Sequence, residues 1–344
     1  MRPIPIRLVA AIALALVFLP GLFLRDRGQR WDHRRQLAIS PLAVPEDLAA
    51  RLGPFRLQGA WQLSSRDYLF GGYSALLARP DGSLLAISDR GARLTFTPPP
   101  AGPGPYRMAR TPPDRADWAG LQDAEAATTG PSGEVWVAWE DRRAISRFSP
   151  DLSRAILVVP EEMRNWSTHF GPESLARTAD GQFIVVSEAF VPRSYERQHE
   201  TLVYPSDPTA GITRQSVPAS VRARHGRLFA ASGYRPTDLA LLPDGRALVL
   251  LRQMTWPLPM RYSGRIALAD PAELLRTGQW HAHDLARLDA PVPSDNYEGL
   301  AVRPRADGRL DVWVISDDNR SSTQRTLLLK LLLDPRDLPP RQTG

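Results

Sequence analysis

The chain has 344 residues, of which 43% are hydrophobic, so it is long enough to bury a substantial core. It contains no cysteine, which excludes disulfides, thiolate zinc sites and a cysteine nucleophile. The formal net charge of +6 does not indicate nucleic-acid binding, because Lys330 is the only lysine and the arginines are scattered among acids without a basic run.

The N-terminus predicts export. Arg2 and Arg7 precede an apolar stretch over residues 8–24, which is the pattern of a signal peptide. These 17 residues are at the lower limit for a membrane span and no clear cleavage site follows, so an uncleaved anchor is the alternative. We expect residues 1–24 to be a signal peptide or membrane anchor, and the protein to be periplasmic, anchored in the inner membrane facing the periplasm, or secreted. Residues 25–53 are predicted to be a polar spacer, weakly helical towards its end.

One strand–turn–strand unit recurs five times. Each copy has an Asp-Gly or Ser-Gly turn between two apolar segments of strand-like composition, which predicts a β-hairpin. The turns begin at residues 81, 132, 180, 244 and 307. Their spacing of 48 to 64 residues leaves room for about four short strands per unit, the size of a propeller blade.

The remaining segments fit outer strands and loops. Residues 55–63 and 326–333 are predicted strands that would join the two ends of the chain and close a ring. Residues 98–113 are rich in proline and glycine and are predicted to be a loop. Residues 190–234 are expected to hold outer strands and one extended loop over the rim, and residues 271–276 a short helix.

The predicted fold is therefore all-β: a single β-propeller over residues 54–335, after an N-terminal signal or anchor helix and before a flexible tail at 336–344. The five hairpins and one blade built from both termini give six blades as the expected count, with five and seven as alternatives. We expect a monomer.

Acidic residues recur at one register of these hairpins. In an antiparallel hairpin, the residue that enters the first strand and the residue that leaves the second lie at the same edge. Glu298 and Asp317 are equally far from the centre of the Asp307-Gly308 turn, so they should be neighbours. In the other four copies, the positions seven before and eight after the turn are the rim positions and add more carboxylates, giving seven at one channel mouth: Asp89, Glu125, Glu140, Glu173, Glu188, Glu298 and Asp317. The Asp residues of the turns lie at the opposite edge and are predicted to be structural.

So many carboxylates cannot all stay ionised together without cations, because like charges raise one another's pKa. Hard oxygen ligands suit Ca²⁺, or Mg²⁺ with retained waters. Alternatively, arginines pair with the acids and leave a mixed-charge pocket. The predicted metal ligands are Asp89, Glu125, Glu140, Glu188, Asp318 and Asn319. No Walker loop or dinucleotide fingerprint occurs, and we expect no nucleotide, flavin or haem.

Hydrolysis at such a rim would use metal-activated water, a carboxylate general base and an arginine that holds an anionic leaving group. We assign Glu173, Glu298, Asp317 and Arg252 to this catalytic group. The predicted substrate-binding residues are Arg90, Arg142, Tyr73 and Tyr297. No nucleophile elbow of the Gly-x-Ser-x-Gly type occurs.

These motifs resemble the exported bacterial family described as "esterase-like activity of phytase", or phytase-like proteins. The most specific segments are residues 295–301 (DNYEGLA) and 315–319 (ISDDN), supported by residues 87–91 (ISDRG). The resemblance implies a β-propeller and a calcium-assisted hydrolase of phosphate or carboxylate esters. The chain departs from the family at Leu251-Arg252, where the resemblance leads us to expect Glu-Arg.

Three functions remain open at this stage. The first is a hydrolase of a small-molecule ester or phosphoester, with the membrane contacted only through the N-terminal segment. The second is a metal-dependent lactonase, since other propellers use similar acidic channel mouths. The third is a non-catalytic propeller of the cell envelope that binds a ligand or partner and holds a structural metal.

Overall fold

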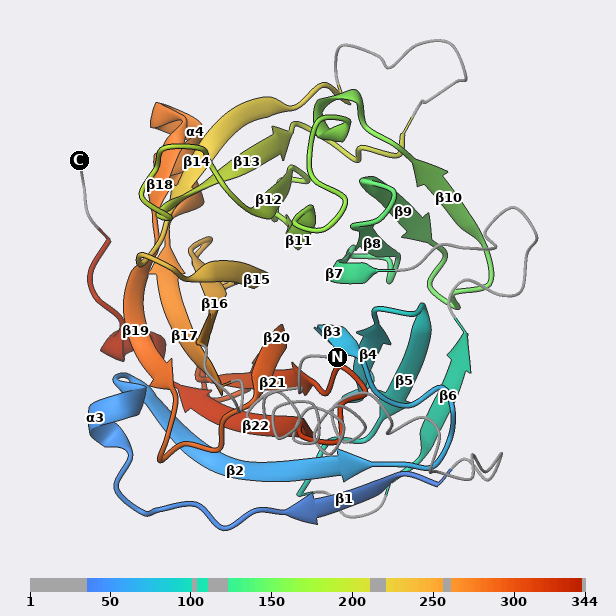
Figure 1. Ribbon diagram of the computed structural model, residues 1–344, viewed down its shortest axis with the longest axis vertical. Coiled ribbons are helices and arrows are strands. Elements are labelled where there is room, and N and C mark those ends of the chain that lie inside the picture. Colours follow the sequence, from blue (N-terminus) through green and yellow to red (C-terminus); the bar gives the residue numbers. More distant parts are fainter. Residues whose placement is uncertain (1–35, 101–103, 111–122, 211–220, 256–260, 342–344) are drawn as a thin grey trace, which may run out of the picture.

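The five predicted hairpins are all present, and each forms the two innermost strands of one blade (Figure 1). The five turn glycines share a φ between 80° and 92°, a conformation that glycine adopts without steric cost. The hairpins are β3 (Tyr73–Ala78) with β4 (Leu84–Ser88), β7 (Ala124–Thr129) with β8 (Val135–Trp139), β11 (Pro172–Arg177) with β12 (Phe183–Phe190), β15 (Arg235–Leu241) with β16 (Ala247–Thr255), and β20 (Asn296–Pro304) with β21 (Leu310–Asp317).

The computed structural model describes residues 36–100, 104–110, 123–210, 221–255 and 261–341. We number the blades I to V by their hairpins in chain order. The outer strands are β5 (Ala92–Phe96) and β6 (Tyr106–Arg110) in blade I; β9 (Ala144–Phe148) and β10 (Ala155–Val158) in blade II; β13 (Gln198–Tyr204), β14 (Arg224–Phe229) and β18 (Gln279–His281) in blade III; β17 (Arg261–Ala269) and β19 (His283–Leu288) in blade IV; and β22 (Thr326–Leu333), β2 (Phe55–Ser64) and β1 (Ala38–Pro41) in blade V. The helices are α3 (Ala49–Leu52) and α4 (Pro271–Thr277), with 3₁₀ turns at Glu161–Met163 and Pro335–Asp337.

The expected count of six blades is wrong, because the described residues form five. Strands β2 and β22 do pair with each other, as predicted for the ends of the chain. However, β22 also pairs with β21 of the fifth hairpin, so the termini complete that hairpin's blade and build no further one. The ring is thus closed within blade V, where the first strands of the chain lie outside the last (Figure 1).

Three other segments differ from the prediction. The expected loop at 98–113 contains β6, which pairs along its whole length with β5. The expected spacer at 25–53 contains β1, which pairs with β2 in blade V, whereas α3 lies where a weak helix is predicted. Part of the expected tail packs on the domain, since Leu338 is buried in the core and Arg341 lies 2.7 Å from Asp270. The short helix predicted at 271–276 is confirmed as α4, whose N-cap is Asp270.

The hydrophobic core lies between blades. Five clusters of buried side chains occur, and each joins two neighbouring blades. Alternate residues of one strand serve different clusters: in β4, Leu84 and Ala86 face blade V, while Leu85 and Ile87 face blade II. A strand buried on both faces reads as a continuous apolar run, which explains why these strands lack a polar–apolar alternation.

The predicted signal or anchor segment, residues 1–24, lies outside the described residues. Within the described ranges, no helix is long and apolar enough to cross a membrane.

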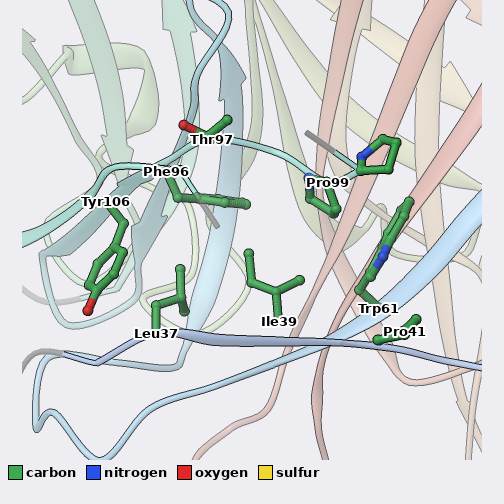
Figure 2. A pocket seen from close by; sticks show the side chains of 10 residues that line it. Leu37, Ile39, Pro41, Trp61, Phe96, Thr97, Pro99 and Tyr106 are labelled. Atoms are coloured by element: carbon green, nitrogen blue, oxygen red, sulfur yellow. The ribbon is translucent and has the colours of Figure 1, made fainter. Parts of the chain in front are cut away.

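An apolar cavity of about 460 Å³ lies at the outer edge of the ring, where blade V meets blade I. Leu37 and Ile39 come from the first described segment, Trp61 from β2, and Phe96 and Tyr106 from blade I (Figure 2). None of its lining residues belongs to the predicted acidic rim.

One buried carboxylate joins the innermost strands of blades IV and V. Asp238 in β15 is 1% exposed and accepts hydrogen bonds from the backbone N–H groups of Leu239, at 2.8 Å, and Leu300 in β20, at 2.6 Å. Burial raises the pKa of Asp238 well above its usual range, against the lowering effect of these two hydrogen bonds. The side chain therefore has a structural function between blades.

Replacing Asp238 with alanine should destabilise the propeller by about 3 kcal/mol, because two buried N–H groups lose their acceptor. Urea unfolding measures this change. The matched control is Asp307→Ala in an exposed turn, which should cost less than about 1 kcal/mol. Equal midpoints for Asp238→Ala and the wild-type protein would contradict the assigned function of this residue.

Candidate metal and catalytic site at the channel mouth

A β-bulge occurs at the same position of every innermost strand. The residue left unpaired is Ser74 in blade I, Glu125 in II, Glu173 in III, Thr237 in IV and Glu298 in V. A bulge re-aims a side chain and locally ends regular pairing. These are the residues that the repeat register places at the rim, so the bulges give a structural reason for the recurring acids.

The seven predicted carboxylates line one cavity of about 520 Å³. Four blades contribute them: Asp89 from blade I, Glu125 and Glu140 from II, Glu173 and Glu188 from III, and Glu298 and Asp317 from V. Blade IV contributes Arg252 instead. The convergence expected from the hairpin register is therefore present in the structure.

Three of these acids are close enough to share a cation. Glu140, Glu173 and Glu188 each offer an oxygen, and these oxygens lie within 4.8 Å of one another. All three side chains are buried, and the backbone N–H of Gly171 donates a 2.5 Å hydrogen bond to Oε1 of Glu140. A buried Oδ1 of Asp89 in the same cavity has no hydrogen-bond partner. Three carboxylates at this separation fit a hard divalent cation such as Ca²⁺ or Mg²⁺.

Arg252 is the internal counter-ion of the cavity. Its Nη2 donates to Oε1 of Glu188 at 2.7 Å, and its Nη1 donates to Oδ1 of Asn296 at 2.8 Å and to Glu298. Asn296 in turn donates to Glu298 at 2.7 Å. Burial acts to lower the pKa of Arg252, but the carboxylates of Glu298, Glu188 and Glu173 outweigh it and raise the pKa. The side chain therefore stays charged and holds two of the acids in place.

The other acids hold protons unusually tightly. Burial raises the pKa of Asp89 to about 7, with Arg90 opposing and Glu298 adding to the shift. Burial also raises the pKa of Glu140 to about 7, against the hydrogen bond from Gly171. For Glu125 and Asp317, burial and then the repulsion of Glu298 raise the pKa well above the usual range. The pKa of Glu173 is raised in the same way, by burial and then by Glu125.

Several residues assigned to the rim from the sequence lie elsewhere. Tyr73 and Tyr297 are 0% and 1% exposed and pack in the hydrophobic core, so their position does not support substrate contact. Arg90 and Arg142 are exposed and are not among the cavity-lining residues that the structure describes. Asp318 accepts a 3.1 Å hydrogen bond from the backbone N–H of Gly72 and is not among the cavity-lining residues that the structure describes.

Asn319, another predicted ligand, is exposed and lines the cavity. Its backbone N–H donates a 2.7 Å hydrogen bond to Oδ1 of Asp317. It therefore lies next to an acid of the rim, on the side of blade V.

One part of the cavity wall cannot be predicted from the hairpin register. Phe170, Phe190, Arg235, Met254 and Tyr262 all line it. They lie near the rim positions but do not recur from copy to copy, so a search for repeated residues cannot find them. Of these five residues, only Phe190 lies within the long segment 190–234 that is expected to extend over the rim, so that expectation identifies little of the wall.

The fold and the cavity define a five-bladed β-propeller with an acidic channel mouth. The model of the phytase-like family, described as "Esterase-like activity of phytase", matches residues 69–320. The chain belongs to this family, as the sequence motifs predicted. No curated protein sequence matches the chain.

Solved structures with a similar overall shape are distant in sequence. An endo-arabinase from Bacteroides thetaiotaomicron is 10% identical with a TM-score of 0.48, and the match covers 80% of this chain and 96% of that one. A glutaminyl cyclase from Myxococcus xanthus is 11% identical with a TM-score of 0.43, covering 81% and 97%. A PQQ-bound aldose sugar dehydrogenase from Streptomyces coelicolor is 12% identical with a TM-score of 0.43, covering 86% and 98%. None of these likenesses bears on chemistry.

The raised pKa values predict how stability depends on pH without a metal. The folded chain binds these protons more tightly than the unfolded chain, so the acids stabilise the fold most below their ordinary pKa near 4. That contribution is lost as pH rises through about 7, the pKa of Asp89 and Glu140. Buried His199 has the opposite effect: burial lowers its pKa to about 4, so its contribution to stability is lost as pH falls below the ordinary pKa of histidine. Measurements should therefore stay above about pH 6.5, the ordinary pKa of histidine.

With a chelator present, the melting temperature should fall as pH rises from about 6.5 to about 8.5. Added Ca²⁺ should reduce this fall, because bound cations favour the ionised carboxylates. Differential scanning fluorimetry measures both. A melting temperature that rises over this range in chelator would show that the cluster does not hold protons as described.

A second prediction concerns Arg252→Gln, which removes the internal positive charge. In chelator, the variant should melt below the wild-type protein, because Glu188 and Glu298 lose their partner. Added Ca²⁺ should then raise its melting temperature more than that of the wild-type protein. The matched control is Arg287→Gln, which removes an exposed arginine paired with Asp289 on the outer surface. The same calcium-induced shift in Arg252→Gln, Arg287→Gln and wild-type protein would refute this function of Arg252.

Proposed function

We propose that the protein is an exported hydrolase of phosphate or carboxylate esters that works with a divalent cation at the acidic channel mouth. Membership of the phytase-like family supports the class of reaction. The observation that carries the proposal is the cluster of Glu140, Glu173 and Glu188, whose oxygens lie within 4.8 Å of one another inside a substrate-sized cavity.

Glu140, Glu173 and Glu188 would hold the cation, with Ca²⁺ preferred and Mg²⁺ as the alternative. A bound cation would supply positive charge to a phosphoryl or carbonyl oxygen and lower the pKa of a neighbouring water. This assignment moves Glu173 from the predicted catalytic group to the ligand set. Arg252 keeps Glu188 in place, and its hydrogen bonds to Glu188, Asn296 and Glu298 make it a positioning residue.

Asp89 and Asp317 suit the proton transfers. A general base works best with a pKa near the operating pH, and burial raises the pKa of Asp89 to about 7. Asp89 lines the cavity, and its Oδ1 has no hydrogen-bond partner. The pKa of Asp317 is raised well above its usual range, first by burial and then by Glu298 and Asp89, which favours the protonated form that an acid needs.

The reaction balances with these two groups. Water gives a proton to Asp89 as its oxygen adds to the carbonyl carbon or phosphorus of the ester. The bond from that centre to the alcohol oxygen breaks, and this oxygen takes its proton from Asp317. An acid and an alcohol leave, and a proton returns from Asp89 to Asp317 through the solvent.

Hydrolysis of a nitrophenyl ester and a nitrophenyl phosphate by the purified protein, with Ca²⁺ or with chelator, tests the proposal. We expect Ca²⁺-dependent turnover that falls by about 100-fold in Asp89→Asn, the size expected for loss of a general base. Glu173→Gln should also lose turnover, through weaker calcium binding. The matched control Glu46→Gln changes an exposed acid outside the cavity and should leave activity unchanged.

Absence of turnover on both substrates, in a folded protein that Ca²⁺ stabilises, would reject the hydrolase. It would favour a non-catalytic envelope propeller with a structural metal. Full turnover in the presence of chelator would instead show that hydrolysis needs no bound divalent cation.

A further inference from the structure

The cavity at the channel mouth has two chemically different sides. On the side of blades I, II and V, the side chains that line it are mostly carboxylates. Blades III and IV add apolar side chains and one further arginine, contributed by Phe170, Phe190, Arg235, Met254 and Tyr262. We call these five residues the aromatic wall. The metal-binding triad lies between the two sides, since Glu140 comes from blade II and Glu173 and Glu188 from blade III.

Arg235 contacts both phenylalanines of this wall and Glu188 of the triad. Its guanidinium carbon lies 4.5 Å from the ring centre of Phe170 and 4.3 Å from that of Phe190, so both rings contact the cation. Its Nη1 donates a 3.2 Å hydrogen bond to the backbone carbonyl of Glu188 and lies 3.8 Å from Oε2 of the same residue. The positive charge is thus fixed directly beside the metal-binding triad.

Two apolar side chains of the wall remain open to solvent. Phe170 is 43% exposed and Met254 is 46% exposed, although both line a cavity. These two side chains present apolar surface to a ligand in the cavity, and covering that surface would be favourable. A flat apolar group of a ligand would cover Phe170 and contact the wall while its polar end reaches Arg235 and the triad.

The charge of the cavity argues against polyanionic substrates. Among the described residues that line it, nine are carboxylic acids and two are arginines, which makes the formal charge −7 when all are ionised. One bound divalent cation leaves this negative, and Arg252 is already paired with Glu188 and Glu298. An inositol polyphosphate would meet strong repulsion here, whereas a neutral or singly charged ester would not.

We propose that the substrate is a neutral or mono-anionic ester with an aromatic or similar flat apolar group next to the bond that breaks, and that Phe170, Phe190 and Arg235 determine this specificity. The inference rests on the proposed hydrolase function, because it assigns the substrate class of the same site. Phe170 and Phe190 would contact the apolar group, and Arg235 an oxygen of the ester or its acid product.

The test compares 2-naphthyl acetate and methyl 2-naphthyl phosphate, a mono-anionic diester, with ethyl acetate, dimethyl phosphate and phytate. We expect the naphthyl esters to have the higher kcat/KM within each ester class and phytate to be the poorest substrate. Phe170→Ala should raise KM for the naphthyl esters by about tenfold and leave the small alkyl esters unchanged. The matched control is Ile156→Ala in β10, which truncates an exposed apolar residue on the outer edge of blade II.

A binding measurement separates this inference from the proposed function. Fluorescence titration with 2-naphthalenesulfonate, which has no ester bond, should show binding that weakens about tenfold in Phe170→Ala and is unchanged in Ile156→Ala. If no ester is hydrolysed but this pattern is found, the hydrolase is rejected and the aromatic wall is supported as a binding site. If esters are hydrolysed but alkyl esters or phytate are preferred, or Phe170→Ala has no effect, the inference is overturned and the hydrolase stands.

Discussion

The crowding of carboxylates at the channel mouth is the constraint on which the functional site depends. Nine acids line one cavity, seven of them the predicted rim carboxylates from four blades, and burial there makes an ionised carboxylate costly. The protein offsets this in two ways within the described residues. Arg252 pairs with Glu188 and Glu298, and burial raises the pKa of groups such as Asp317, which favours their neutral form. A cation held by Glu140, Glu173 and Glu188 would be the third.

The propeller tolerates this crowding of carboxylates because hydrophobic packing between its blades stabilises the fold. The five hydrophobic clusters lie between blades, away from the mouth, and each blade contributes to two of them. The bulges at Ser74, Glu125, Glu173, Thr237 and Glu298 end regular pairing at the same level of every innermost strand. The scaffold is therefore repetitive, and the chemistry depends on which side chain stands at each bulge and at the residue facing it.

The parts of the structure that repeat could be predicted from the sequence. The hairpins, their glycine turns and the presence of Glu298 and Asp317 at one rim follow from register, which is a local property, although the bulge pairs Asp317 with Asn296 and leaves Glu298 unpaired. The blade count could not be derived this way, because it depends on whether β22 pairs with β21 or starts a separate sheet. Strand β6 could not be predicted either, because the proline and glycine residues around it favour a loop.

Only the recurring residues of the site could be predicted from the sequence. The acids were found because they recur, but Phe170, Phe190 and Arg235 occur once each and come together only when blades III and IV are side by side. Tyr73 and Tyr297 directly precede rim residues, yet strand alternation and the bulge turn them into the core. Side-chain direction at an irregular position is not readable from sequence spacing.

Anomalous diffraction from crystals soaked with Tb³⁺, a substitute for Ca²⁺ with the same preference for oxygen ligands, tests the central claim most directly. We predict a strong anomalous peak in contact with Glu140, Glu173 and Glu188, and its disappearance in Glu173→Gln crystals. A cavity without a peak, with terbium bound only to exposed carboxylates on the outer surface, would contradict it.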